Sequence, residues 1–432
     1  MSNLSDTEAR VNGHIDTDAA LELEVAAVKI PSPSFHEEQV ADLFAAFMQE
    51  IGLDVRMLEV PHPFREEVLT RQPVGVLKGA DGGPTLMING HMDHNPAVGE
   101  WDRPFFSGDF EDGWIYGRGA QDDKGGIVAS IVAAKALVDS GVRLCGDIWV
   151  CPVAGHKSGG LGTKHLIQEG WLPDYCINTE NSGNGLARAS VGVVKCDLTV
   201  RGTPVHFGSS SQAKANHSNA VNQIAEVAIS LGESLSFVGD KSWLDFERCP
   251  SLPGYPALSL DEIRSTRYMG TVPESNTPEF TAYLEFQIRT VPGQTVESIR
   301  ADLRRHLKRL KSDYPKLDVL EVNVPTKNPE FQGWDMPPFE TPPDARLVQA
   351  LANAHRDAVG VEPVVGGEPR LGAVGDGNIL AGLGVEVVEY GPGDHTAFET
   401  WPMMNERIAL QEIVDCARAI AVASVRLLGT EK

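Results

Sequence analysis

The segment at residues 84–96, PTLMINGHMDHNP, joins a short apolar run to a cluster of polar residues. Its first half ends at Gly90 and is typical of a buried β-strand. His91, Asp93 and His94 follow directly. Open parallel sheets bind ligands beyond the carboxyl ends of their strands. The segment therefore predicts a strand of such a sheet, with functional side chains where it ends.

The same arrangement recurs along the chain. IWVCPVAG (residues 148–155) leads into His156 and Lys157, and YCINT (residues 175–179) leads into Glu180. VEVVEYGPGD (residues 385–394) leads into His395, and Asp122 stands at the start of a helical segment. Strands that alternate with helices predict an α/β fold, a mostly parallel sheet flanked by helices.

The pattern changes near residue 188. The segment at residues 191–208 alternates like an exposed antiparallel strand, and further helices and strands follow before the first pattern returns after about residue 325. A chain of 432 residues is also too long for one ordinary core. We therefore expect a catalytic domain of residues 1–187 and 326–432, interrupted by a smaller α+β domain of residues 188–325.

The composition excludes several classes of partner. A formal net charge of −23 opposes binding to nucleic acid and to anionic membranes. The chain has no apolar run of about 18 residues and no signal-peptide pattern at its start. Six scattered cysteines indicate free thiols in a reducing compartment. These features predict a cytoplasmic protein that acts on a small molecule.

The local sequence leaves the role of the polar cluster open. A single histidine after a strand is usually a hydrogen-bonded turn residue, whereas a His-x-Asp pair places both side chains on one face of a strand. In that case Asp93 would orient His91 as a metal ligand. From these residues alone, a metal site and a polar turn remain equal alternatives.

The segment at residues 90–126, GHMDHNPAVGEWDRPFFSGDFEDGWIYGRGAQDDKGG, resolves this choice by resemblance. It resembles the metal-dependent hydrolases that include aminoacylase, acetylornithine deacetylase, succinyl-diaminopimelate desuccinylase and glutamate carboxypeptidase. Their pattern is G-H-x-D, then W-x-x-P-F, then Y-G-R-G-A-x-D-x-K-G. Further similarity at SGGLGTKHLI, RGTPVHFG, FQIRTVPGQTVESI and YGPG extends it over nearly the whole chain. The resemblance implies a catalytic domain that carries an inserted lid.

The resemblance also implies roles for individual residues. His91, Asp122 and Glu180 would bind metal, and Asp93 would orient His91. His206 of the lid would reach the active site of a partner subunit and stabilise negative charge there. Arg289 would hold the carboxylate of the substrate, and the lid would form at least a homodimer.

The chain departs from the family pattern in three places. The family has Asp-Glu-Glu where this sequence reads AGHKSGG, so His156 replaces the general base and Lys157 replaces a ligand of the second metal. Pro402 stands where the last histidine ligand is expected, and His395 is the nearest histidine. An ammonium repels a cation, so we expect one divalent transition metal per subunit, Mn²⁺ or Zn²⁺. Lys157 and His395 would then contact substrate.

These departures shape the expected reaction. His156 would accept a proton from water that the metal activates, and the substrate would be a small carboxylate. The sequence resembles the variant of the family that hydrolyses the aromatic amine of 5-nitroanthranilate to 5-nitrosalicylate and ammonia. The alternatives are an amidohydrolase, deacylase or dipeptidase for N-acyl amino acids, and an inactive member that serves as a binding protein.

Overall fold

The computed structural model describes residues 4–62, 65–80, 82–203, 210–212, 217–232, 243–266, 280–328, 335–366, 374–393 and 403–431. The chain divides into two compact units. The first comprises Met1–Ser190 and Phe339–Lys432, and the second comprises Val191–Pro338. None of the described helices is long and apolar enough to cross a membrane.

The predicted end of the inserted unit at residue 325 is wrong, because the unit continues to Pro338. The added segment contains β14 (Asp335–Met336), which pairs with β10 (Gly192–Arg201) and sets Met336 opposite Val193. These backbone pairs make β14, which lies in a Pro-rich stretch of the sequence, part of the sheet of the second unit.

An eight-stranded sheet forms the centre of the first unit. In spatial order its strands are β1 (Asp54–His62), β2 (Arg65–Leu77), β6 (Ile148–Val153), β3 (Leu86–His91), β7 (Tyr175–Asn178), β17 (Glu386–Glu389), β8 (Leu186–Ala187) and β16 (Val365–Gly366). The four central strands, from β6 to β17, run parallel to one another. Strand β2 pairs antiparallel with β6, and β1 pairs antiparallel with β2. The predicted α/β class with a mostly parallel sheet is confirmed.

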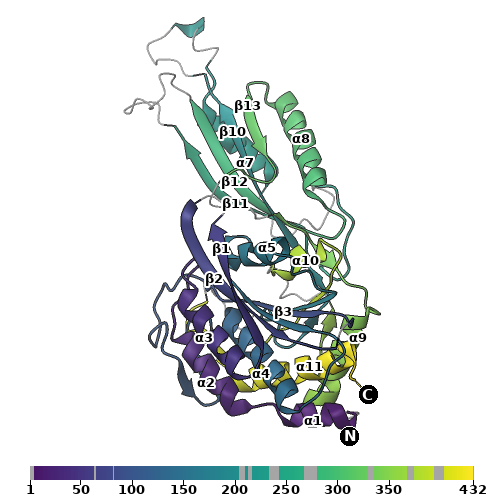
Figure 1. Ribbon diagram of the computed structural model, residues 1–432. Coiled ribbons are helices and arrows are strands. Elements are labelled where there is room, and N and C mark those ends of the chain that lie inside the picture. Colours follow the sequence, from purple (N-terminus) through teal and green to yellow (C-terminus); the bar gives the residue numbers. More distant parts are fainter. Residues whose placement is uncertain are drawn as a thin grey trace. The chain divides into compact units, whose positions relative to one another are not determined.

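Helices cover both faces of this sheet. Those of the first unit are α1 (Asp6–Gly13), α2 (Thr17–Val28), α3 (Glu38–Glu50), α4 (Gly125–Asp139), α5 (Leu161–Gln168), α9 (Arg346–Val359), α10 (Gly377–Ala381) and α11 (Leu410–Leu428). Figure 1 shows α4 and α11 on one side of the sheet and α5 and α10 on the other. Two small sheets complete the unit, β4 (Asp109–Glu111) with β5 (Trp114–Tyr116) and β18 (Arg407–Ala409), and β9 (Ala189–Ser190) with β15 (Phe339–Glu340).

Strand β3 shows why its sequence is apolar without alternation. Successive side chains of a strand point to opposite faces. Leu86 and Ile88 accordingly pack in the core cluster that contains residues of α4 and α11, whereas Met87 packs with Leu166 and Leu380 in a second cluster. Both faces of β3 are therefore buried, and its polar groups gather at its carboxyl end.

The described part of the second unit is a smaller sheet with two helices. Its main strands are β11 (Ala257–Ser265), β12 (Thr281–Thr290), β10 and β13 (Val319–Asn323), and its helices are α7 (Ala220–Leu231) and α8 (Val296–Asp313). The prediction of an exposed strand at the start of this unit is wrong, because β10 is buried along almost its whole length. It lies between β12 and β13, and Asn323 and Thr326 donate hydrogen bonds to Asp197.

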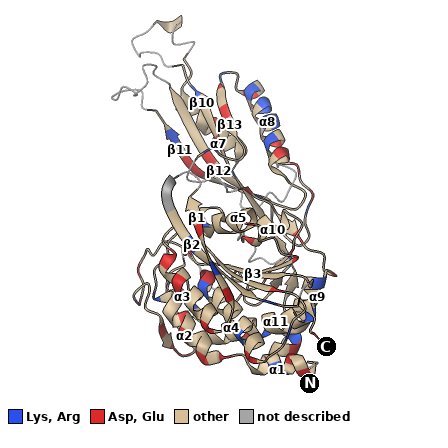
Figure 2. Ribbon diagram, in the orientation of Figure 1, with Lys and Arg blue, Asp and Glu red and all other residues tan. Residues whose placement is uncertain are grey.

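Charge is unevenly distributed over the helices. Acidic side chains are prominent on α2 and α3, whereas α8 carries mainly Lys and Arg (Figure 2). Two of the arginines in α8, Arg300 and Arg305, pair with acidic residues three positions earlier, Glu297 and Asp302. The net charge of −23 therefore does not describe the local surface of the second unit.

Candidate metal centre

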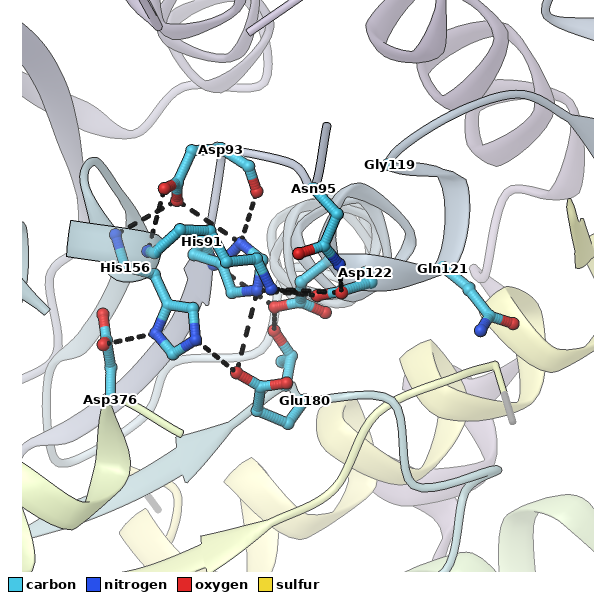
Figure 3. Close-up of polar contacts among 12 residues, drawn as sticks. His91, Asp93, Asn95, Gly119, Gln121, Asp122, His156, Glu180 and Asp376 are labelled. Atoms are coloured by element: carbon cyan, nitrogen blue, oxygen red, sulfur yellow. Dashed lines mark hydrogen bonds and ion pairs between the residues drawn. The ribbon is translucent and has the colours of Figure 1, made fainter. Parts of the chain in front are cut away.

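The carboxyl ends of three neighbouring strands and one loop bring five predicted site residues together. His91 ends β3, Glu180 follows β7, and η2 (His156–Ser158) follows β6 with His156 and Lys157. Asp122 lies in η1 (Ala120–Lys124), directly before α4. Figure 3 shows the side chains of His91, His156, Asp122 and Glu180 facing one another. Five side chains that are spread between positions 91 and 180 of the sequence thus form one cluster.

His91 presents an unshared nitrogen to two carboxylates. Its Nδ1 donates a hydrogen bond of 2.7 Å to the backbone carbonyl of Asp93, so the neutral ring carries its lone pair on Nε2. This Nε2 atom is buried and makes no hydrogen bond among the residues that the structure describes; it lies 2.9 Å from Asp122 Oδ1 and 3.7 Å from Glu180 Oε1. A lone pair that faces two carboxylates is stabilised by a cation among them, so these donors fit a divalent metal.

His156 lies over His91 and is held from behind. Its Nδ1 is 2.8 Å from Asp376 Oδ1, and its Nε2 is 3.6 Å from Glu180 Oε1. The two imidazoles stack with centroids 4.3 Å apart and planes inclined by 9°. Burial opposes the charged form of His156, but the carboxylates of Asp376 and Glu180 outweigh it and raise the pKa to about 9.

Lys157 binds the carboxylate of Asp122. Its Nζ lies 3.0 and 3.1 Å from the two oxygens of Asp122, and Asn95 donates a hydrogen bond of 2.8 Å to Oδ2. Burial opposes ionisation of Asp122, yet the Lys157 ammonium and His91 hold its pKa well below the usual range. The carboxylate that is predicted to bind metal is therefore paired here with an ammonium.

Asp93 contacts His91 mainly through its backbone, and its carboxylate Oδ1 lies 3.6 Å from His91 Nδ1. The backbone carbonyl of Asp93, not its carboxylate, receives the Nδ1 hydrogen bond of His91. Its carboxylate instead accepts the backbone N–H groups of His156 and Lys157, at 3.1 and 2.9 Å, and the hydroxyl of Ser34. Asp93 thus positions the turn that carries His156 and Lys157.

A buried ion pair supports the loop that carries Asp122, and sequence reasoning did not identify it. Both side chains, Arg118 and Glu406, are fully buried and lie 2.8 Å apart. The carboxylate of Glu406 also accepts the backbone N–H groups of Gly119, Gln121 and Asp122, at 3.0, 3.1 and 3.2 Å.

The carboxylate of Asp376 was also missed. Asp376 stands between two glycines in the sequence GAVGDGN, at the start of α10. A glycine-rich segment of this kind indicates a role for its backbone and gives no separate signal for the Asp376 side chain. Besides His156, it accepts a hydrogen bond of 2.8 Å from the hydroxyl of Thr163. Thr163 in turn accepts one of 3.0 Å from Asn89, a residue of β3.

Three predicted residues are not placed at this centre. His206 and His395 lie outside the described residues. Arg289 lies near the end of β12 in the second unit, and burial lowers its pKa. Its buried Nη1 atom makes no hydrogen bond within the described part of the chain. The substrate-binding role of Arg289 therefore remains a prediction.

The comparison with known proteins agrees with this geometry. A model of peptidase family M20/M25/M40 matches residues 87–424. The chain belongs to this family. Members of the M20 family are hydrolases that depend on divalent metals, and the chain presents a candidate site for one among buried His and Glu side chains.

Several relatives of this M20 chain are enzymes that act on acylated amines by name. N-formyl-4-amino-5-aminomethyl-2-methylpyrimidine deformylase of Bacillus subtilis is 25% identical over 410 residues, which cover 90% of this chain and 89% of the relative. Succinyl-diaminopimelate desuccinylase of Nitrosomonas eutropha is 26% identical over 367 residues, 81% of this chain and 85% of the relative. The solved structure of the di-peptidase Dug1p of Saccharomyces cerevisiae matches with a TM-score of 0.72 and 17% identity, over 99% of this chain and all of that one.

Proposed function

We propose that this M20 protein uses one divalent metal to hydrolyse a non-peptide C–N bond of a small substrate that carries a carboxylate. The observation that carries the proposal is the pair between Lys157 and Asp122. It sets a fixed positive charge against the carboxylate that would otherwise serve two cations. His91, Asp122 and Glu180 are then the proposed protein ligands of the single Mn²⁺ or Zn²⁺.

The residues of the site divide the work as follows. His91, Asp122 and Glu180 would hold a divalent metal, which would supply Lewis-acid activation of a water molecule. A positive charge beside Glu180 would offset the carboxylate that helps to raise the pKa of His156, and the neutral Nε2 would then accept the proton of that water and return it to the leaving amine. Lys157 and Arg289 would hold the carboxylate of the substrate, and His206 and His395 are further candidates for substrate contact. Arg289 suits this role because its planar fork can bind a carboxylate at two points.

One candidate reaction is the hydrolytic deamination of an aromatic amine such as 5-nitroanthranilate, which yields 5-nitrosalicylate and ammonia. Attack of water on the ring carbon moves negative charge into the ring, where a para nitro group can hold it. No amide oxygen has to be polarised, so a second cation is not required. The Lys157–Asp122 pair favours this candidate.

The second candidate is the removal of an acyl group from an amine, and the relatives support it more directly. Both curated relatives described above are named for this type of reaction, a deformylation and a desuccinylation. A deacylase with one metal would need another donor for the developing negative charge, and the ammonium of Lys157 is available.

An assay of the metal-loaded protein distinguishes the candidates. Release of ammonia from 5-nitroanthranilate would support ring deamination, whereas release of formate, succinate or acetate from N-acyl substrates would support deacylation. Turnover of dipeptides alone would contradict the proposed restriction to non-peptide bonds. Failure with every substrate, together with tight binding of one of them, would identify an inactive binding protein.

The number of metals can be measured directly. Protein stripped with a chelator and reloaded to saturation is expected to bind about one ion per subunit by elemental analysis. Two ions would show that Lys157 does not replace the second cation and would contradict the one-metal proposal. We further propose that the protein works in the cytoplasm as a homo-oligomer, at least a dimer formed through the second unit.

A further inference from the structure

We infer that Asp376 is a positioning residue that fixes His156 as a proton acceptor beside the metal, and that His156 is not itself a ligand of the metal. The inference deepens the proposed function and rests on it for the catalytic consequence only. It is carried by the hydrogen bonds around Asp376 and by the relative orientation of two imidazole rings.

The first observation concerns the tautomer of His156. Asp376 accepts hydrogen bonds from His156 Nδ1 and from the Thr163 hydroxyl, both at 2.8 Å, and is only 2% exposed. Its pKa is lowered despite burial by the nearby His156 and Thr163, so it is an anion and only accepts. His156 must then donate from Nδ1, and the lone pair of the neutral ring lies on Nε2, which faces Glu180.

The second observation excludes shared ligation by the two histidines. The lone pair of an imidazole nitrogen lies in the plane of its ring. The rings of His91 and His156 are inclined by only 9°, and their centroids lie 4.3 Å apart. Stacked rings direct their lone pairs along separate, nearly parallel planes, so His156 would not share an ion that His91 holds. This orientation separates their roles, although their donor atoms and that of Glu180 lie within 4.8 Å of one another.

The same orientation suits proton transfer. A metal ligand needs a contact of about 2.0–2.2 Å, which stacking prevents. A general base needs to lie only about 2.6–3.2 Å from the water molecule whose proton it accepts. His156 can therefore act as a base from its position stacked on His91. The carboxylate behind the ring keeps the nitrogen that faces the site unprotonated in the neutral ring and stabilises the imidazolium that forms.

The test combines Asp376→Asn with the matched control Thr163→Val. The first substitution would present an amide to Nδ1 and disfavour the required tautomer, whereas Thr163→Val leaves the carboxylate in place. We expect Asp376→Asn to lower kcat by about 10²–10⁴-fold with KM changed less than about threefold. Thr163→Val should lower kcat by less than about tenfold. Equal kcat in Asp376→Asn and the parent protein would overturn the inference.

Two measurements do not depend on the reaction. The Kd for Zn²⁺, measured by calorimetry on the stripped proteins, should be unchanged within about threefold in Asp376→Asn. A loss of 10–100-fold would identify His156 as a ligand whose orienting partner had been removed and would overturn the inference. In the zinc-loaded parent protein, ¹⁵N NMR of the histidine rings should show Nδ1 of His156 protonated and Nε2 free of metal. Metal bound to Nε2 would refute it even if the variants failed to fold, and even if no substrate were turned over.

Discussion

Lys157 changes what Asp122 can do. A carboxylate with two free oxygens can join two cations, but here both oxygens of Asp122 lie within 3.1 Å of the Lys157 ammonium. The ammonium of Lys157 is covalently attached and offers no coordination position to water. It therefore neutralises the charge of Asp122 without activating water. We propose that this pair suits Asp122 to one metal instead of two.

Replacement of Lys157 by methionine is expected to tighten metal binding and impair use of the substrate. The change removes the repulsion between an ammonium and a divalent cation that share Asp122, and we expect a Kd lower by about tenfold. It also removes a proposed partner of the substrate carboxylate, so KM should rise by about tenfold. Calorimetry with Zn²⁺ and steady-state kinetics check the two effects, and weaker metal binding would contradict the assignment of the ammonium.

His156→Ala should abolish turnover while the fold remains intact. A positioned general base contributes about 10²–10⁴-fold to a rate, so kcat is expected to fall by that factor. The Kd for the metal should be unchanged within about threefold, because His91, Asp122 and Glu180 remain. Added imidazole should restore part of the activity through the cavity that the variant leaves. Full activity without imidazole would remove His156 from the mechanism.

At the scale of elements, the loop before α4 is organised by a segment nearly 300 positions away. Glu406, next to β18, accepts hydrogen bonds from three backbone N–H groups of this loop and pairs with Arg118. Arg118 also donates a hydrogen bond of 2.6 Å to the carbonyl of Met403. The side chain of Glu406 therefore holds Asp122 in place through the backbone of this loop.

Glu406→Ala should lower both the stability and the metal affinity. Loss of one partner of a buried ion pair costs about 3–5 kcal/mol, because Arg118 keeps an uncompensated charge. The freed loop should weaken metal binding by about 10–100-fold. The double variant Glu406→Gln with Arg118→Met separates the effects. It should recover much of the stability in urea denaturation while its Kd stays high. A double variant with the parent Kd would show that the pair does not position Asp122.

At the scale of the whole molecule, the two ends of the chain complete one core. The second unit is inserted between Ser190 and Phe339, so strands and helices from both sides of it build the first unit. Figure 1 shows both termini on the side of the sheet that α4 and α11 cover. Arg426 of α11 contacts Glu8 of α1 at 2.6 Å and Asp357 of α9 at 3.0 Å. These pairs tie together three helices that are distant in sequence.

The contact of Glu8 with Arg426 predicts a specific dependence of stability on pH. Burial opposes ionisation of Glu8, but hydrogen bonds from Arg426 and Ser5 lower its pKa below the usual value. A lowered folded-state pKa stabilises the protein above the unfolded value of about 4.3, and this contribution is lost as the pH falls through the folded value. Glu8→Gln should therefore cost about 0.5–1 kcal/mol at pH 7 and almost nothing near pH 3. Urea denaturation at both pH values checks this, and an equal cost at pH 3 would contradict it.

Local sequence was sufficient for much of the fold and part of the centre. Apolar runs that end in polar residues identify β3, β6 and β7, since burial on both faces of a strand is a local requirement of its composition. The residues directly after them include His91, His156 and Glu180. The limits of the second unit were less accurate, because the pairing of β14 with β10 joins segments whose composition does not suggest a strand.

The amino-acid sequence alone determined the family, the sheet with its polar strand ends, and the replacement of two acidic residues by His156 and Lys157. Only the tertiary structure decided which partners these side chains have. Asp376 lies 220 positions from His156, and Glu406 lies 284 positions from Asp122. Such contacts depend on how strands and loops are ordered in space. The local periodicity of apolar residues does not predict that order. The physical reason is that composition sets burial residue by residue, whereas the tautomer of a histidine and the charge of a carboxylate depend on the atoms that the fold sets beside them.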